Sequence, residues 1–265
     1  MPVKLAALRS HLESSLAGRI LAPFAYRDRR SVETVSAGIA AVDALAGGLP
    51  RGGLTEICGP FCSGRTSLLL AALASRTAHA EACALVDGGD AFDPHSAEAA
   101  GVQLQQLLWV RCRSIDQALR ATDLLLQGGG FGLIALDLGD LPSETVRYVP
   151  LNAWFRFRRA VEDTPTILLL LEQESHAKTC ASLVLRLEAG PVRWSSAMPG
   201  RHPQACLFDG WRARAELLHS RIQPAAAAFS PEGFAPADSA GGMAMFETQA
   251  KGSYFDGVPI EPKTQ

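Results

Sequence analysis

Short apolar runs alternate with helical apolar patterns through the middle of the chain. Near-continuous apolar runs, each short enough for one buried strand, lie at 54–58, 83–86, 133–136 and 167–171. An apolar helix is expected from Thr66 onward, and the pattern predicts another helix at 150–162. Strands that alternate with helices in this way predict an α/β core.

The two ends of the chain have different patterns. Leucines at helical spacing predict one amphipathic helix over residues 4–18, so residues 1–30 are expected to form an N-terminal helix and linker. Residues 31–222 are expected to form the core domain, which ends in short antiparallel strands after Leu187. From Gln223 the composition shifts to Ala, Pro, Gly and Ser. Residues 223–265 are therefore predicted to be a disordered tail, either inert or docking on a partner through its aromatic residues.

Composition and charge narrow the function classes. The chain has 265 residues, of which 48% are hydrophobic, and a formal net charge of −2, so no bulk positive field favours non-specific DNA binding. The six cysteines form no CxxC pair, which argues against a zinc site and favours reduced thiols in a cytosol. The longest apolar run is too short to cross a bilayer and no signal peptide is evident. A cytoplasmic protein without membrane contact is expected.

One segment has the pattern of a phosphate-binding loop. Gly59-Pro-Phe-Cys-Ser-Gly-Arg-Thr66 lies between an apolar strand and an apolar helix, where glycines and a helix N-terminus present N–H groups to a phosphate. The usual pattern is GxxxxGK[ST], and Arg65 occupies the lysine position. Arg65 keeps the charge, but its planar guanidinium is not equivalent to a slim ammonium.

Several ordered motifs resemble the RecA-type recombinase core. The resemblance begins with the run SVETVSAGIAAVDALAGGLPRGGLTEICGPFCSGRTS from residue 31 and continues through 83–94, 131–137 and 166–173. It implies a RecA-like P-loop NTPase core with a largely parallel central sheet flanked by helices and antiparallel strands at its C-terminal end. It also implies ATP and Mg²⁺ as cofactors.

The resemblance also assigns candidate site residues. Nucleotide contacts would come from Gly59, Pro60, Ser63, Gly64, Arg65, Thr66, Ser67, Asp93 and Asp137. Thr66 and Asp137 would hold the Mg²⁺ ion, and Gln173 matches the glutamine that senses the γ-phosphate. An alternative interpretation is that Thr66 caps a helix and Asp137 braces the loop, so that both serve the fold.

Two departures from the family pattern argue against catalysis. The family's general base is a glutamate two residues after the aspartate of the second core strand, and Gly89 stands there instead. Asp90 is next to it and remains a candidate base, although one residue along a strand end re-aims a side chain. Ser96 replaces an aromatic residue that would stack on adenine. Together with Arg65, these changes predict weak or lost nucleotide binding and a protein that is not an enzyme.

The segments that would bind DNA in recombinases are short here. Only residues 141–149 correspond to the first loop and 174–180 to the second, so DNA contact is expected to be weak or indirect. Arg156 and Arg159 alternate with aromatic residues on the helix predicted at 150–162. They are candidates for DNA or partner contact, and a solvated face of a core helix is the other interpretation.

This combination resembles the RecA-like accessory proteins of the bacterial translesion mutasome, the ImuA family. The resemblance implies an adaptor in damage-induced translesion synthesis and the SOS response. Its partners would be a Y-family-like mutasome polymerase, an error-prone replicative-type polymerase and RecA, at the bacterial nucleoid when recruited. An active RecA-fold ATPase and a DNA-binding regulator of recombination remain alternatives.

Overall fold

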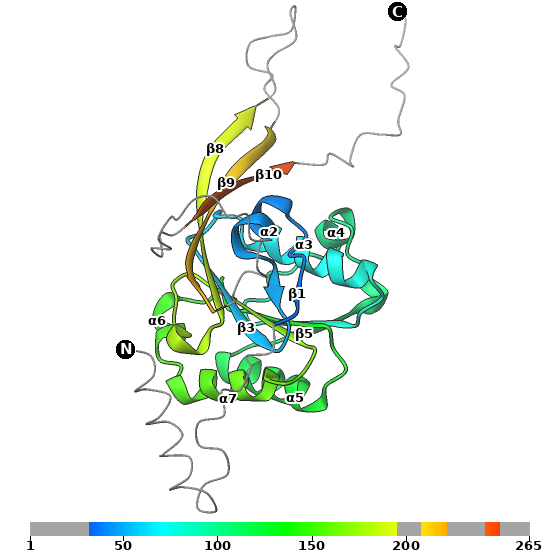
Figure 1. Cartoon of the computed structure of the whole chain (residues 1–265), viewed down its shortest axis with the longest axis vertical. Helices are drawn as coiled ribbons and strands as arrows, with labels where there is room; N and C mark the ends of the chain where they lie inside the picture. Colours follow the sequence, from blue (N-terminus) through cyan, green and yellow to red (C-terminus); the bar gives the residue numbers. More distant parts are fainter. Residues whose placement is uncertain (1–31, 195–207, 222–241, 250–265) are drawn as a thin grey trace, which may run out of the picture. The chain divides into compact units, whose positions relative to one another are not determined.

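The computed structural model describes residues 32–194, 208–221 and 242–249. The predicted N-terminal helix at 4–18 therefore lies outside the described residues, as does most of the predicted tail. The described residues form one eight-stranded sheet with strand order β10-β9-β8-β3-β7-β6-β4-β5 and helices on both faces (Figure 1).

Six neighbouring strands of this sheet run parallel, from β8 at one side to β5 at the other edge. They are β3 (Gly53–Cys58), β4 (Cys83–Asp87), β5 (Leu107–Arg111), β6 (Leu133–Asp137), β7 (Ile167–Glu172) and β8 (Leu183–Trp194). Every residue of β3, β4 and β7 is buried, which explains their near-continuous apolar sequences. The prediction of an α/β fold with a largely parallel sheet is confirmed.

Helices cover both faces and divide the core into two layers. One layer contains α2 (Ala40–Ala46), α3 (Arg65–Ala78) and α4 (Pro94–Ala99). The other contains α5 (Ile115–Gly128), α6 (Ser143–Arg147) and α7 (Leu151–Val161). Figure 1 shows α2, α3 and α4 on one side of the sheet and α5 and α7 on the other.

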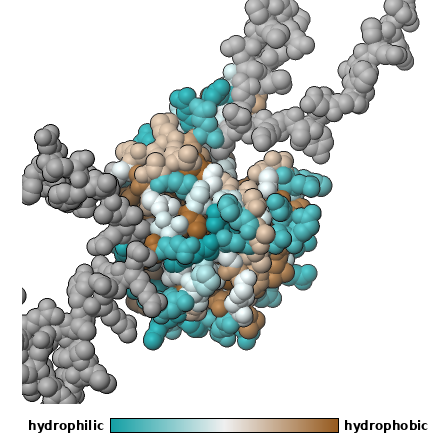
Figure 2. Space-filling view, turned by 45° about the vertical axis from the view of Figure 1, so that its right-hand side comes forward, coloured by the Kyte–Doolittle hydropathy of each residue, from teal (hydrophilic) through white to brown (hydrophobic). Residues whose placement is uncertain are grey.

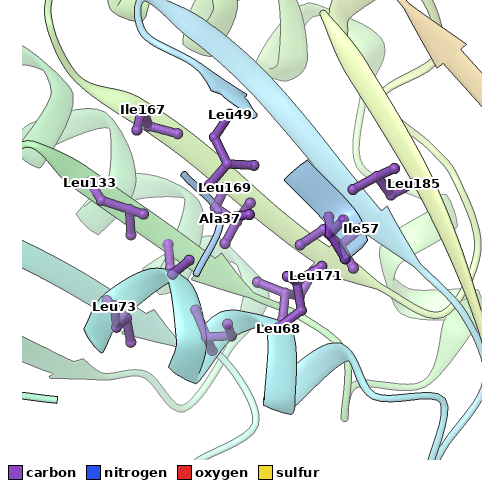
Figure 3. Packing of buried hydrophobic residues seen from close by; sticks show 14 of the residues in the cluster. Ala37, Leu49, Ile57, Leu68, Leu73, Leu133, Ile167, Leu169, Leu171 and Leu185 are labelled. Carbon is purple, nitrogen blue, oxygen red and sulfur yellow. The ribbon is translucent and has the colours of Figure 1, made fainter. Parts of the chain in front are cut away.

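Each strand contributes side chains to both layers, because successive side chains point to opposite faces of the sheet. Ile57 of β3 and Leu171 of β7 belong to the α3 layer, where Figure 3 shows them near Leu68. Leu54 and Leu170, on the same two strands, belong to the α5 and α7 layer. The central parallel strands are therefore largely apolar on both faces. Asp87, Asp137 and Glu172 each end a strand, whereas Glu56 is buried within β3.

Two antiparallel strands extend the sheet beyond β8. They are β9 (Phe208–Ser220), which pairs with β8, and β10 (Met243–Gln249), which pairs with β9. Phe246 of β10 is buried in the α3 layer, with 5% of its surface exposed. The expectation of a disordered tail over 223–265 thus does not hold for 243–249, which pairs with an existing sheet edge and buries Phe246 while Met243 and Met245 are exposed.

Small elements complete the described structure. A separate two-stranded sheet joins β1 (Thr34–Val35) to β2 (Leu49–Pro50), and two short 3₁₀ turns are η1 (Leu104–Gln106) and η2 (Lys178–Cys180). Hydrophilic and hydrophobic residues are interspersed over the face that Figure 2 presents. Among the described helices, none is long and apolar enough to cross a membrane.

Candidate functional site

The phosphate loop connects β3 to α3, and its glycines are required by close contacts. Gly64 precedes α3 with φ 99°, and a Cβ there would lie 3.0 Å from Ala213 Cβ and 3.2 Å from Phe246 Cζ. A Cβ on Gly59 would lie 2.3 Å from the carbonyl oxygen of Leu187. Larger residues would push the loop away from β8, β9 and β10 at these two positions.

The N-terminus of α3 has the features of an anion site. Among the residues that the structure describes, no side chain caps this helix, so its first-turn N–H groups have no capping acceptor there. Ser63 is buried, and its Oγ has no hydrogen-bond partner in the described part of the chain. Thr66 is exposed and Ser67 half-buried in the first turn, and Pro60 is exposed at the start of the loop. The predicted loop residues are thus together at one helix N-terminus.

Arg65 does not point out of the loop into solvent. The residue is 7% exposed, and its Nη2 donates a hydrogen bond of 3.2 Å to the carbonyl oxygen of Gly139. Its guanidinium lies 5.9 Å from the ring centroid of Phe61, and Nη1 is buried with no hydrogen-bond partner among residues 32–194, 208–221 and 242–249. A Cβ on Gly139 would lie 2.2 Å from Nη1, so only glycine leaves room for the guanidinium. The arginine therefore reaches across to the end of β6.

Asp137 ends β6 and lies beside the same glycine. Its Oδ1 accepts a hydrogen bond of 2.9 Å from the Gly139 N–H. Burial raises the pKa of Asp137 to about 6, while the Gly139 hydrogen bond and the positive charge of Arg65 oppose that rise. The structure therefore brings Arg65 and Asp137 together, as the motif positions suggested.

Gln173, the predicted γ-phosphate sensor, is engaged with the loop that follows β6. Its Nε2 donates to the carbonyl oxygens of Gly139 at 3.1 Å and Leu141 at 2.9 Å. Residues after β3, β6 and β7 therefore meet at one carboxyl edge of the sheet, as parallel strands require. In this arrangement both amide hydrogens of Gln173 are used within the protein.

The position of the expected base is blocked. A Cβ on Gly89 would lie 2.8 Å from Cβ of Asp140, so a glutamate there requires the loop after β6 to move. Asp90 has φ 54° and accepts two hydrogen bonds from Arg111, at 2.6 and 2.7 Å. These hydrogen bonds lower the pKa of Asp90 and make it a poorer proton acceptor.

The pairing also places Asp90 away from the phosphate loop. Arg111 ends β5, the edge strand on the side of β4 opposite to β6, β7 and β3. The carboxylate that sequence suggested as a substitute base is thus turned toward the far edge of the sheet.

Asp93 serves as the N-cap of α4. Its carboxylate accepts hydrogen bonds from the backbone N–H groups of His95 at 3.2 Å and Ser96 at 3.0 Å. The Ser96 hydroxyl donates to it as well, and these bonds lower the pKa of Asp93. The predicted adenine contact is therefore also a structural cap in this chain.

The residues do not fit the Mg²⁺ ion that the resemblance implies. The guanidinium of Arg65 fills the space beside Asp137, and Arg is always protonated in proteins. A divalent cation at Asp137 would have to displace the arginine.

Arg156 and Arg159 lie apart from the phosphate loop, on α7 in the opposite layer. Arg156 pairs with Asp123 at 3.1 Å and lies 5.7 Å from the ring centroid of Phe157. Arg159 is exposed, and Trp154 and Phe157 are core residues. Two of the three aromatic residues of α7 thus serve packing, which favours the amphipathic core-helix interpretation, while Phe155 is 41% exposed.

Sequence inspection missed a buried carboxylate beneath the second loop. Glu56 in β3 accepts hydrogen bonds from Ser175 Oγ at 2.8 Å, His176 N at 2.7 Å and Ala177 N at 3.1 Å. The only sequence signal is a glutamate in an otherwise apolar strand, which indicates a buried polar contact. The role of Gly139 was missed as well, since its only sequence signal is its place two residues after the strand-end Asp137.

Comparison with known proteins agrees with this arrangement. Residues 6–140 match the family model described as the RecA N-terminal domain. The chain belongs to this family. The matched region covers half of the chain and includes the phosphate loop, the strand ending in Asp87 and the strand ending in Asp137.

Two curated relatives, both named Protein RecA, show a similar extent. The protein from Colwellia psychrerythraea is 39% identical over 108 residues, which cover 40% of this chain and 31% of the relative. The protein from Allorhizobium ampelinum is 38% identical over 136 residues, which cover 50% of this chain and 38% of the relative. The chain thus spans about a third of the length of these relatives.

Proposed function

We propose that this RecA-family chain is an accessory protein of damage-induced translesion DNA synthesis, of the ImuA type. It acts as an adaptor through protein contacts, with a degenerate nucleotide site, and not as a recombinase. The partners we propose are a Y-family-like mutasome polymerase, an error-prone replicative-type polymerase and RecA. The proposed location is the bacterial cytoplasm, with recruitment to the nucleoid after damage.

The observation that carries this proposal is the pairing of Asp90 with Arg111. A RecA-type ATPase depends on a carboxylate that takes a proton from the attacking water. Here the base position is Gly89, closed by Asp140, and the neighbouring carboxylate is held by two charge-assisted hydrogen bonds at the edge strand. This supports a protein that does not depend on ATP turnover.

The second loop supports the same proposal. Three of its groups, from Ser175, His176 and Ala177, donate to Glu56 within the sheet. A short loop tied to a buried carboxylate has little freedom to follow a DNA backbone. This supports indirect DNA contact, in which a partner polymerase holds the primer terminus.

Affinity capture from DNA-damaged cells tests the adaptor role. The tagged full chain would be compared with a truncation after Gln249, which keeps β10 and its buried Phe246. Recovery of a translesion polymerase with the full chain is expected, and its loss with the truncation would assign the contact to residues beyond 249. Repeated recovery of neither a translesion polymerase nor RecA would overturn the proposal.

The phosphate loop favours one alternative, an active ATPase. Its unpartnered Ser63 and uncapped α3 are suited to a phosphate. That alternative requires steady ATP turnover that Asp137→Ala abolishes, whereas the adaptor requires none. Phosphate release by the purified full chain separates the two.

A further inference from the structure

Two buried donors at the phosphate loop have no acceptor among the residues that the structure describes. They are Ser63 Oγ, in the turn that leads into α3, and Nη1 of Arg65, the first residue of that helix. Buried polar atoms without partners are uncommon in folded proteins and indicate a missing partner. The uncapped N-terminus of α3 adds backbone N–H groups beside them, so the missing partner is an anion.

The guanidinium of Arg65 lies beside Asp137, the carboxylate that the resemblance assigns to a metal ion. The point at which a Cβ of Gly139 would lie is 2.2 Å from Arg65 Nη1 and 3.1 Å from Asp137 Oδ1. The guanidinium and the carboxylate therefore crowd the same glycine. A permanent positive charge at this place repels a divalent cation and offsets the charge of Asp137.

The arginine is held in this position from several sides. Nη2 donates to the Gly139 carbonyl, which also accepts a hydrogen bond from Gln173, and the guanidinium lies near the Phe61 ring. Gly139 has no side chain that could displace it. A cation that is fixed before the ligand arrives needs no ion to complete the site.

We propose that the phosphate loop of this chain binds a nucleoside diphosphate or triphosphate without a divalent metal, with the Arg65 guanidinium in place of the ion. The inference concerns the same loop as the proposed function but does not depend on the adaptor role. Bound ligand remains intact, because no base is available at Gly89. The loop would then report nucleotide without consuming it.

Calorimetric titration of the full chain with ADP tests this inference. One titration contains EDTA and the other excess MgCl₂, and the two dissociation constants are expected to agree within about twofold, since the positive charge is built into the protein. With Arg65→Lys, binding in EDTA is expected to weaken by about tenfold or more and to recover with MgCl₂. Arg120→Lys, an exposed change on α5, should behave as wild type.

A metal probe gives a second measurement. Paramagnetic resonance with Mn²⁺ and ADP should detect no bound ion in the wild type and one ion with Arg65→Lys. If Arg65→Lys does not fold, Gly139→Ala replaces it, because its Cβ displaces Nη1 and should abolish metal-free binding. Wild-type binding that MgCl₂ strengthens by about tenfold or more would overturn the inference, as would no ADP binding in either titration. Neither result bears on partner capture, so the adaptor role stays separately testable.

Discussion

Arg65 and Gln173 donate hydrogen bonds to the same acceptor, the carbonyl oxygen of Gly139, at 3.2 and 3.1 Å. The first residue comes from the phosphate loop and the second follows β7, so the segment after β6 is held from two neighbouring strands. A ligand that moves one of these side chains must act on the other through the shared carbonyl. Two hydrogen bonds through one carbonyl therefore connect the Arg65 guanidinium to Gln173, the candidate γ-phosphate sensor.

The stability of the core beside the phosphate loop is expected to depend on β10. Phe246→Ala removes a ring that is 5% exposed and lies in the α3 layer, and it should lower the free energy of unfolding by about 3–5 kcal/mol. Met245→Ala is the matched control, because Met245 is 50% exposed and should change stability by less than about 0.5 kcal/mol. Urea denaturation of both variants checks this. Equal stability of the two variants would show that β10 does not contribute to the core.

Asp90 is expected to have no part in ATP turnover. Its carboxylate is committed to Arg111, and the two hydrogen bonds lower its pKa. Phosphate release by the full chain should therefore be at background and unchanged in Asp90→Asn. Turnover in the wild type that Asp90→Asn removes would contradict this and restore Asp90 as the base.

Stability is expected to fall as pH rises from about 4.5 to about 7. Burial raises the pKa of Glu172 from 4.5 to about 7, and its hydrogen bond of 2.6 Å to His176 raises the pKa of that imidazole. The folded protein therefore holds protons that the unfolded chain has released. This contribution to stability is complete below the unfolded carboxyl pKa of 4.5 and is lost as pH rises through about 7.

Denaturation curves measured at several pH values check this slope. Glu172→Gln should flatten the fall between about pH 5 and 8, because the variant has no proton to release there. Glu174→Gln, an exposed change in the same segment, should keep the wild-type slope. Asp137 adds a fall of the same sign, so some slope should remain in Glu172→Gln. A slope that Glu172→Gln leaves unaltered would exclude this carboxyl as the source.

Single-stranded DNA binding is expected to be insensitive to α7. Arg156 is paired with Asp123, and the second loop is tied to Glu56. Replacing both Arg156 and Arg159 with alanine should leave the affinity and its salt dependence unchanged in fluorescence anisotropy. A direct DNA interface on α7 would instead reduce the slope of log affinity against log salt by about one for each lost phosphate contact.

The sequence predicted the arrangement of the core because its strands are apolar on both faces and end in polar residues. Runs such as 54–58 and 167–171 leave few alternatives to buried parallel strands. The phosphate loop then follows from its glycines and the helix after it. The α7 helix was also predicted within one residue at each end.

The side-chain directions could not be predicted. Arg65 could have pointed to solvent or to β6, and its position depends on the missing side chain of Gly139, which is distant in sequence. Asp90 is directed by its positive φ and by Arg111 on another strand. β10 was missed because local composition around it is typical of linkers, while its pairing with β9 is a tertiary contact.

The contact between β10 and the phosphate loop has a consequence for biosynthesis. Phe246 lies next to Gly64 in the fold, yet it belongs to β10, the last described element to be translated. Contacts between residues so far apart in sequence form late in folding, because the intervening chain must first be ordered. On the ribosome, the phosphate loop and α3 emerge early, before the β10 strand that packs against them has been synthesised. A nascent chain that is released or cleaved before residue 243 would contain the complete phosphate-loop motif but would lack the packing of β10 against that loop.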